Sequence, residues 1–376
     1  MRKCCQITAV HSAFDVRIFH KEAKTLTEAG YDVTLIARHN KNETVDGIKI
    51  IALPKLKNRF ERFLKTDFLL FKKALEQKAN VYHFHDPELI LVGVLLKIFT
   101  KAKIIYDVHE DVPRDILYKE WIPVIFKHPL SFSVNFIEKN ISKFFDCIIA
   151  ATEYIKDQFK PYNNNVIEIK NYPLLKFNSK IPKNDFFANN KCVLVYTGTI
   201  GKNRGIEEII KAMELINSCS KISLNLMGRF SNEILKQKIT CSEEYTKINF
   251  LGELSLNKVF EEITKADIGI VCLYPTRCFL SSLPVKMFEY MTAGLPVIAS
   301  NFPLWKEIIE KNNCGICVNP LDPKEIGEAI EYLIKHPEEA KKMGENGKRA
   351  VLEKYNWDLE AKKLLKIYEI IFANEK

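Results

Sequence analysis

The amino-acid sequence predicts an α/β protein made of two doubly wound, Rossmann-like domains in tandem. The first observation is size, because 376 residues with 47% hydrophobic content exceed one ordinary domain and supply enough apolar residues for two cores. The second is the pattern: short β-rich runs alternate with helix-length amphipathic segments from end to end, which is typical of parallel sheets covered by helices on both faces. The third is a polar, proline-bearing segment without periodicity, NYPLLKFNSKIPKND, near the middle of the chain.

The expected strands form two series on either side of that segment. The first series is Cys4–Val10, Asp32–Ala37, Ile48–Ile51, Val81–Phe84, Ile104–Tyr106, Cys147–Ala151 and Val166–Ile169. The second series is Cys192–Thr197, Ile222–Met227, Ile248–Leu251, Ile268–Val271, Pro296–Ala299 and Ile316–Val318. Gly30 is expected to end the first helix, because glycine tolerates the positive φ of a helix terminus. We therefore expect an N-terminal domain over residues 1–170, a linker over 171–187, a C-terminal domain over 188–355 and a terminal helix over 356–376.

Composition excludes several classes of protein. No apolar run reaches the roughly 18–20 residues of a membrane span, since the longest, Leu89 to Leu96, stops at Lys97. The N-terminal sequence MRKCCQITAVHSAF resembles a first strand more than a signal peptide, so we expect a cytoplasmic protein. Ten scattered cysteines, most of them in strand-like runs, indicate reduced and buried thiols. The lone pair Cys314 and Cys317 lacks the four ligands of a structural zinc site, and no metal or nucleic-acid partner is expected.

The positive charge is unevenly distributed. The net charge is +9, and residues 1–178 carry 28 basic against 21 acidic residues. Two segments of this half have two interpretations each. The stretch from Lys55 to Lys78, with Phe60, Phe63, Phe68 and Phe71 between its charges, is either a basic amphipathic helix on an anionic membrane or a surface helix facing the core. The aromatic stretch from Trp121 through Phe126 to Phe136 is likewise either core or a contact with the inner face of the plasma membrane.

Polar clusters follow three strands of the first series. They are His11-Ser-Ala-Phe-Asp15-Val-Arg17, His83-Phe-His85-Asp86-Pro87-Glu88 and Asp107-Val-His109-Glu110-Asp111. Doubly wound sheets bind ligands beyond the carboxyl ends of their strands, so three such clusters together favour a functional role over isolated histidine hydrogen bonds. Asp86, directly before Pro87, is by itself most simply a helix cap. The absence of a GxGxxG sequence after the first strand argues against dinucleotide binding.

A glycine-rich turn follows the first strand of the second series. Gly198, Gly201 and Gly205 allow the backbone to approach a phosphate, and Lys202 or Arg204 can neutralise it at the positive end of the next helix. The turn does not match the Walker pattern, and its spacing alone is a weak signal.

The stretch SSLPVKMFEYMTAGLPVIAS predicts a helix and a following strand. Ser281 or Ser282 is expected to cap the helix, Pro284 fits its first turn, and the amides from Ser282 to Val285 then form a second anion site. Lys286 adds charge beside it. Glu289 shares a helical face with Lys286, which predicts either a surface ion pair of about 0.2–0.5 kcal/mol or a carboxylate acceptor for two ribose hydroxyls. Ala293 and Gly294 close the helix.

The pattern P-x-K-x-x-E-Y-M-x-A-G-x-P-V-I-A-S, preceded by TGTIGKNRG and followed by CGICVNPLDP, resembles the donor-binding half of glycosyltransferase family 4. HSAFDVRIFHKEAKTLTEAGYDVTLIA, FHDPELI and YDVHE are similar to the family's acceptor-side half, so the resemblance covers nearly the whole chain. It implies the GT-B fold, in which the two domains face across a cleft, with the terminal helix crossing back to the first domain. It also implies transfer of a sugar from a UDP- or GDP-type nucleotide sugar to a glycan or lipid-linked acceptor, with retention of configuration and without a metal. The sequence contains no D-x-D pair.

The resemblance also assigns roles to residues. Glu289 would hold the ribose, Arg204 the diphosphate, and His109 would lie against the donor sugar. Apart from the resemblance, Asp15, Asp107 and Glu110 are candidates for orienting the acceptor. The expected catalytic residues are His109, Arg204, Lys286, Glu289 and Asp15. The expected donor-binding residues are Gly198, Thr199, Gly201, Lys202, Arg204, Ser281, Ser282, Leu283, Lys286 and Glu289.

Two positions depart from the family's pattern. Ser281 stands where the family has a glutamate, and Thr199 where it often has an arginine, so Lys286 is expected to take more of the phosphate charge. Two alternative functions follow: a nucleotide-sugar epimerase of the same architecture, and a non-catalytic nucleotide-sugar binding protein that has lost the carboxylate at position 281.

Overall fold

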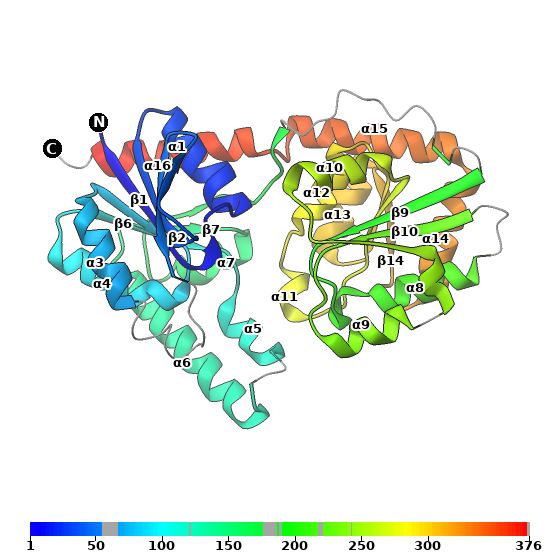
Figure 1. The fold of residues 1–376 in the computed structure, drawn as a ribbon, viewed down its shortest axis with the longest axis horizontal. Coiled ribbons are helices and arrows are strands. Elements are labelled where there is room, and N and C mark those ends of the chain that lie inside the picture. Colours follow the sequence, from blue (N-terminus) through cyan, green and yellow to red (C-terminus); the bar gives the residue numbers. More distant parts are fainter. Residues whose placement is uncertain are drawn as a thin grey trace. The chain divides into compact units, whose positions relative to one another are not determined.

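The computed structural model describes residues 1–54, 67–119, 122–175, 186–187, 190–216, 221–241 and 243–373. The chain divides into two compact units: unit 1 comprises Met1–Asn171 and Asp358–Lys376, and unit 2 comprises Tyr172–Trp357. The C-terminal helix thus belongs to the unit that holds the N-terminus (Figure 1). Most of the expected linker lies outside the described residues.

Unit 1 is built on an eight-stranded sheet in the order β3-β4-β2-β1-β5-β6-β7-β8. Its strands are β1 (Lys3–Ser12), β2 (Asp32–Arg38), β3 (Glu43–Val45), β4 (Ile48–Leu53), β5 (Val81–Phe84), β6 (Lys103–Val108), β7 (Cys147–Ala150) and β8 (Val166–Glu168). Neighbouring strands are parallel except β3, a short antiparallel edge strand that the sequence pattern did not predict. The strand order reverses between β1 and β5, which makes the carboxyl ends of these two strands the topological switch point.

Helices cover both faces of this sheet. They are the π-helix η1 (Val16–Ala23), α1 (Lys24–Glu28), α3 (Asp67–Gln77), the 3-10 helix η3 (Pro87–Leu89), α4 (Ile90–Phe99), α5 (Val112–Tyr118), α6 (Val124–Ser142), α7 (Glu153–Phe159) and α16 (Trp357–Ala373). Gly30 follows the first helix with φ of +87°, as expected of a glycine at a helix terminus. The terminal helix α16 packs on unit 1, where Tyr31 contacts the rings of Tyr368 and Phe372.

Unit 2 has a six-stranded, wholly parallel sheet in the order β11-β10-β9-β12-β13-β14. Its strands are β9 (Lys191–Thr197), β10 (Lys221–Met227), β11 (Ile248–Gly252), β12 (Ile268–Val271), β13 (Val297–Ser300) and β14 (Gly315–Val318). Its helices are η6 (Lys202–Arg204), α8 (Ile206–Leu215), α9 (Glu233–Thr240), η7 (Glu243–Lys247), α10 (Leu256–Lys265), α11 (Arg277–Leu280), α12 (Val285–Thr292), α13 (Pro303–Asn312), α14 (Pro323–Lys335) and α15 (Pro337–Glu353). The order is that of a dinucleotide-binding Rossmann fold, with the switch point between β9 and β12. Both units therefore confirm the predicted doubly wound α/β class.

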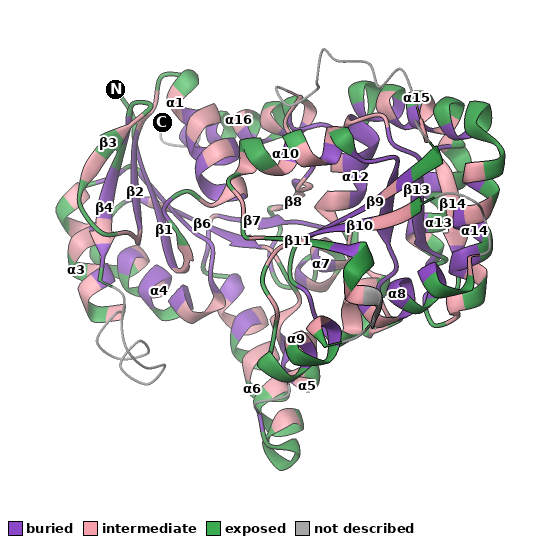
Figure 2. Ribbon diagram, turned by 45° about the vertical axis from the view of Figure 1, so that its right-hand side comes forward, coloured by how far each residue is buried: buried purple, intermediate pink, exposed green. Residues whose placement is uncertain are grey.

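The alternation of side chains along the strands separates two cores in unit 2. Cys192, Leu194 and Tyr196 of β9 pack with α8, α9 and α14, whereas Val193 and Val195 face α10, α12 and α13. Figure 2 shows the strands of both sheets buried, with exposed residues confined largely to helices and loops. Six of the nine described cysteines are buried, as the strand-like runs predicted.

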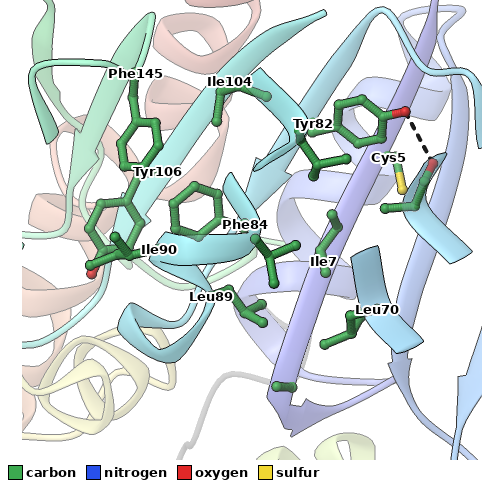
Figure 3. Packing of buried hydrophobic residues seen from close by; sticks show 14 of the residues in the cluster. Cys5, Ile7, Leu70, Tyr82, Phe84, Leu89, Ile90, Ile104, Tyr106 and Phe145 are labelled. Atoms are coloured by element: carbon green, nitrogen blue, oxygen red, sulfur yellow. Dashed lines mark hydrogen bonds between the residues drawn. The ribbon is translucent and has the colours of Figure 1, made fainter. Parts of the chain in front are cut away.

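One face of the sheet of unit 1 carries an aromatic core (Figure 3). The rings of Phe84 and Tyr106 stack with centroids 4.7 Å apart, and Phe145 meets Phe84 edge-on at 5.2 Å. The hydroxyl of Tyr82 donates to the backbone oxygen of Ala74 at 3.1 Å, which satisfies its one polar atom in this apolar setting.

The two segments with alternative interpretations are only partly described. Residues 55–66 of the basic stretch and Trp121 of the aromatic stretch lie outside the described residues, so Phe60 and Phe63 do as well. In α3, Leu70 and Ala74 are buried, Phe71 packs against the core and Phe68 is exposed. This described part behaves as a surface helix facing the core.

Candidate functional site

A glycine-lined loop connects β9 to α8 at the switch point of unit 2. Gly198 has φ of +108°, and Gly228, at the end of the adjacent strand β10, has φ of +138°. A Cβ on Gly228 would lie 1.9 Å from the oxygen of Gly198, so no side chain fits between the two backbones. The amide of Gly198 donates to the oxygen of Met227 at 2.9 Å, and that of Ile200 to the oxygen of Arg229 at 2.9 Å. Gly198 was expected from the sequence, whereas Gly228, which holds its loop in place, was not.

Lys286 of α12 extends toward this loop. If Gly198 carried a Cβ, that atom would lie 3.0 Å from Nζ of Lys286. The same nitrogen lies 3.7 Å from the ring centroid of Tyr196. That nitrogen is buried, and among the described residues it has no hydrogen-bond partner. Burial first, and then the charge of Arg204, lower the pKa of Lys286 well below its ordinary value, whereas Glu289 acts in the opposite direction. A buried amine with no acceptor is costly in the absence of a ligand and is suited to receiving an anion.

Arg204 and Glu289 lie near Lys286. The guanidinium of Arg204, at the end of η6, lies 4.6 Å from the ring centroid of Phe279 in α11, which holds the loop against the segment before α12. Arg204 and Glu289 both act electrostatically on Lys286. Lys286 and Glu289 form no ion pair among the described side chains, so the surface ion pair that their spacing allows is wrong. The structure thus brings Gly198, Arg204, Lys286 and Glu289 together.

The segment before α12 differs from the expectation of a serine cap. The hydroxyl of Ser281 donates to the oxygen of Arg277 at 3.3 Å and that of Ser282 to the oxygen of Phe279 at 3.2 Å, so both serines close the preceding short helix α11. The Ser282 amide also donates to Phe279, so it is not available to an anion. Pro284 is the N-cap residue of α12 rather than part of its first turn. Helix α11 was not predicted, because only four residues form it.

The other expected donor-binding residues lie on or beside these two segments. Thr199 and Lys202 are exposed on the glycine loop, where the carbonyl of Thr199 accepts from the hydroxyl of Tyr196 at 2.9 Å. Gly201 is buried, and a Cβ on it would lie 3.2 Å from Oγ of Ser231. Leu283 packs against the core of unit 2. At the far end of α12, Gly294 has φ of +77°, and the helix closes there as predicted.

In unit 1, the strand pattern gathers polar residues on one face of the sheet. Tyr82 and Phe84 of β5 and Tyr106 of β6 point to the aromatic core, so the alternating residues His83, His85 and Asp107 point to the opposite face. All three of these polar side chains are buried. Residues of the three polar clusters found in the sequence lie together at this edge of the sheet.

Arg17 lies at the centre of this cluster. Its Nε and one terminal nitrogen donate to the two oxygens of Asp107 at 3.0 and 2.9 Å, and Nε also lies 2.9 Å from Glu22. Asp15 is the N-cap of the π-helix η1, and its carboxylate accepts hydrogen bonds from the amides of Arg17 and Ile18. The wider turn of this helix presents Arg17 and Glu22 to the same strands. No role was expected for Arg17 or Glu22, because their burial within the segment VRIFHKEA is seen only in the structure.

The charges of the cluster are balanced internally. Burial alone would raise the pKa of Asp107, but the charges of Arg17 and His109 outweigh it and hold that pKa well below the usual range. Burial and the nearby Asp107 raise the pKa of Glu22 well above its usual range. Burial lowers the pKa of His85 to about 4, so this imidazole is neutral at pH 7.

His109 is the most accessible histidine bound to this network, with 15% of its side chain exposed. Its Nε2 lies 2.9 Å from Asp107 and 3.2 Å from Nδ1 of His85. His11 lies beside it, with the ring centroids of His11 and His109 5.6 Å apart. Nδ1 of His11 is 3.4 Å from a carboxylate oxygen of Asp15. Burial lowers the pKa of His11, but hydrogen bonding to Asp15 and the charge of Asp86 together raise that pKa above its ordinary value. Glu110 is exposed nearby.

Asp86 is not the helix cap that the sequence suggested. Its carboxylate makes no capping bond to η3. It accepts instead from the hydroxyl of Thr8 at 2.8 Å and from the amides of Ala9 and Val10 at 2.6 and 3.1 Å. Asp86 therefore fixes the end of β1 against β5 at the switch point and supports the loop that carries His11 and Asp15.

One group of described residues has donor atoms close enough to surround a metal ion. Ligand atoms of Glu22, His85, Asp107 and His109 lie within 4.8 Å of one another. Arg17 already bridges the two carboxylates of this group, at 2.9 Å from each. A metal cation would have to displace the guanidinium, so the donor set fits a charge-balanced network better than a metal centre.

Two family models match the chain. The model for glycosyl transferases group 1 matches residues 177–350 and the model for Glycosyltransferase Family 4 matches residues 16–169. An uncharacterized glycosyltransferase of Methanocaldococcus jannaschii is 27% identical over 259 residues, which cover 65% of this chain and 64% of the relative. The matched part of this chain thus spans just under two thirds of that relative's length.

Solved structures share the fold over the full length of the chain. Sucrose-phosphate synthase from Thermosynechococcus elongatus superposes with a TM-score of 0.79 at 19% identity, covering 100% of both chains. An Anabaena protein in complex with UDP-glucose gives a TM-score of 0.73 at 13% identity, covering 98% of this chain and 100% of that one. The two family matches, taken with this fold, show that the chain belongs to glycosyltransferase family 4 and has the GT-B fold.

Proposed function

We propose that this protein is a retaining, metal-independent glycosyltransferase that moves a sugar from a nucleoside diphosphate sugar to a lipid-linked or glycan acceptor in cell-surface polysaccharide synthesis. The observation that carries the proposal is the buried Nζ of Lys286, without a hydrogen-bond partner among the described residues and directed at the glycine loop of unit 2. A diphosphate is the anion that such a loop, at the switch point of a Rossmann sheet, is shaped to receive.

The proposed chemistry follows from charge. As the bond between sugar and phosphate breaks, negative charge grows on the diphosphate, and cations already in place at that position lower the barrier most. Lys286 and Arg204 are those cations in unit 2, and Glu289 is the acceptor for the ribose hydroxyls. The Anabaena protein of the same fold was solved with UDP-glucose, which supports a nucleotide sugar as the donor.

In unit 1, we assign His109 to the sugar-transfer step. Asp107 and His85 hold its Nε2 from the buried side, and Asp107 is held in turn by Arg17. Asp15 is restrained by two backbone amides and is available to orient an acceptor hydroxyl. Rigid placement of such groups reduces the entropy cost of bringing the reactants together.

The lipid nature of the acceptor is supported by α6. Figure 2 shows this helix projecting from unit 1 with much of its surface exposed. The α6 apolar face consists of Ile125, Phe132 and Phe136, which are 59–75% exposed and share one side of the helix. Lys127, Lys139 and Lys143 lie on or next to α6, whereas its one acidic residue, Glu138, is buried. Exposed aromatic side chains with basic neighbours suit an anionic membrane surface. No described helix combines the length and apolarity needed to cross a bilayer.

Transfer can be tested directly. The purified protein is incubated with a panel of radiolabelled nucleotide sugars and a membrane extract, with and without EDTA, and the anomeric configuration of the product is read by NMR. Transfer into lipid or glycan with retention, unaffected by EDTA, is the expected result. Interconversion of the nucleotide sugar without an acceptor would indicate an epimerase instead, and tight binding without turnover would indicate a non-catalytic binding protein.

Replacing Glu289 with alanine is expected to abolish nucleotide binding. A carboxylate that accepts two ribose hydroxyls contributes charge-assisted hydrogen bonds, and their loss should weaken binding by at least about tenfold. Isothermal titration calorimetry with UDP and GDP measures the effect. Glu261→Ala, at an exposed glutamate of α10 in the same unit, is the matched control. Unchanged affinity in Glu289→Ala would refute the assignment of the ribose site.

Removing two rings of the α6 apolar face is expected to release the protein from membranes. The double variant Phe132→Ser, Phe136→Ser should bind vesicles of phosphatidylglycerol and phosphatidylethanolamine at least about tenfold more weakly, because each buried ring contributes about 1.5–3 kcal/mol. Cosedimentation measures this, and Ile234→Ser, at a residue of α9 that is 80% exposed, is the control. Equal sedimentation of the double variant and the wild-type protein would exclude α6 as the contact.

A further inference from the structure

A cavity of about 360 Å³ lies within unit 1, where the end of β6 meets α5, α6 and α7. Its volume is within the range of small-molecule sites. Arg17, Glu22, His85, Asp107 and His109 do not line it, so it is separate from the polar cluster described above. Glu110 and Asp111 of its lining belong to the third polar cluster of the sequence, but the cavity itself was not predicted, because most of its walls come from α5, α6 and α7, outside any motif.

The lining of the cavity combines three kinds of surface. Glu110 and Glu138 supply carboxyl groups, Asn135 and Gln158 supply amides, and Phe132 and Tyr154 supply aromatic rings. Each sugar hydroxyl can donate one hydrogen bond and accept two, so a carbohydrate satisfies carboxylates and amides at once. The C–H face of a sugar ring packs on an aromatic ring. This mixture suits a carbohydrate better than a purely apolar molecule.

Glu138 is the unusual member of this lining. Its side chain is 3% exposed, and one carboxyl oxygen accepts the hydroxyl of Tyr106 at 2.5 Å, at the edge of the aromatic core. Burial, and then the charge of Asp111, raise the pKa of Glu138 to about 7. The second carboxyl oxygen remains for a ligand. Among the described residues, the hydroxyl of Tyr106 is the hydrogen-bond partner of this carboxyl group.

The cations of the cavity are already occupied, which argues against an anionic ligand. Arg114 pairs with Asp111 at 3.3 Å and lies 4.3 Å from the ring centroid of Tyr154. Lys139 donates to the side chain of Gln158 at 2.8 Å. The exposed carboxylate of Glu110 would repel a phosphate, whereas a neutral sugar meets no such repulsion.

Phe132 connects the cavity to the α6 apolar face. Its ring lines the cavity, is 71% exposed and stacks on Phe136 with centroids 6.5 Å apart. A ligand with a sugar in the cavity therefore has its other end at a continuous apolar surface. We infer that this cavity binds the carbohydrate part of a lipid-linked acceptor, whose hydrocarbon chain lies along the α6 apolar face. The identity of this ligand as the acceptor rests on the proposed function.

The test uses a variant that fills the cavity. Asn135→Trp places an indole in it, whereas Asn140→Trp, on the next turn of α6 and outside the lining, is the matched control. Saturation-transfer NMR measures binding of n-octyl glucoside, n-octyl mannoside and n-octyl phosphate, each below its micelle-forming concentration. A second variant, Glu138→Gln, keeps the acceptor for Tyr106 and changes only the carboxyl group.

The wild-type protein and Asn140→Trp are expected to bind an octyl glycoside in preference to octyl phosphate, and Asn135→Trp is expected to lose this binding. In the transfer assay, Asn135→Trp and Glu138→Gln should raise the KM for the acceptor by about tenfold or more while the KM for the donor stays unchanged. Preference for octyl phosphate, or transfer with an unaltered acceptor KM in Asn135→Trp, would overturn the inference. Glycoside binding in the cavity without any transfer would instead refute the proposed function alone.

Discussion

Lys286→Met is expected to lower kcat/KM by about a hundred- to thousandfold and to raise the stability of the protein at the same time. The loss of rate follows because a cation placed at a leaving diphosphate typically contributes about 3–4 kcal/mol to the barrier. The gain in stability follows because the buried Nζ has no hydrogen-bond partner among the described residues. Methionine fills a similar space without the desolvation cost, which for such a group is about 1–3 kcal/mol.

The two effects together separate a ligand-binding lysine from a structural one. Thermal unfolding without ligand and steady-state kinetics are measured on the same preparation. Lys306→Met, at a lysine of α13 that is 52% exposed, is the control and should change neither quantity appreciably. If Lys286→Met is less stable than the wild-type protein and retains full activity, the lysine serves packing over Tyr196 and not the donor.

Arg17→Met should destabilise unit 1 by about 3–5 kcal/mol, because it leaves the buried carboxylate of Asp107 without its cation. Urea unfolding followed by circular dichroism measures the loss. Activity should fall as well, since Asp107 holds Nε2 of His109 at 2.9 Å and would no longer be fixed by two hydrogen bonds from Arg17. Arg17→Lys should rescue little, because an ammonium cannot make the paired hydrogen bonds of a guanidinium.

A double variant tests the charge balance behind this expectation. Arg17→Met with Asp107→Asn removes both charges, so most of the lost stability should return although activity does not. Glu22 presents no obstacle in this variant, since burial favours its protonated form and the opposing charge of Arg17 is removed. A double variant that is as unstable as the sum of the two single variants would contradict a charge-balanced network.

The strand pattern alone predicted most of the fold. All thirteen expected strands are present with ends within two residues, because buried parallel strands appear as apolar runs whatever surrounds them. The edge strand Glu43–Val45 was missed because it has three residues with no buried side chain among them. Alternation along β5 and β6 also explains why His83, His85 and Asp107 share one face of the sheet. The sequence is enough for this conclusion once the aromatic residues beside them are assigned to the core.

The site was predicted less completely than the fold. The motif positions Gly198, Arg204, Lys286 and Glu289 come together because they follow strands that meet at one sheet edge. Two predicted helix caps were wrong because another hydrogen-bond partner was preferred. Asp86 accepts hydrogen bonds from β1 rather than from the helix that follows it. Ser281 donates to the end of α11 rather than capping α12. Buried charge pairs such as Arg17 with Asp107 join residues 90 positions apart, so no local sequence pattern predicts them.

Proton uptake on donor binding tests the central claim most directly. Calorimetric titration with UDP- and GDP-sugars is carried out above neutral pH in two buffers of different ionisation enthalpy. Since burial lowers the pKa of Lys286 in the free protein, a bound diphosphate should raise it again and draw a proton from the buffer. We expect net uptake in the wild-type protein, no uptake in Lys286→Met, and an affinity lower by at least about tenfold in that variant. Equal affinity in the two proteins, with the same proton exchange, would contradict a diphosphate site at Lys286.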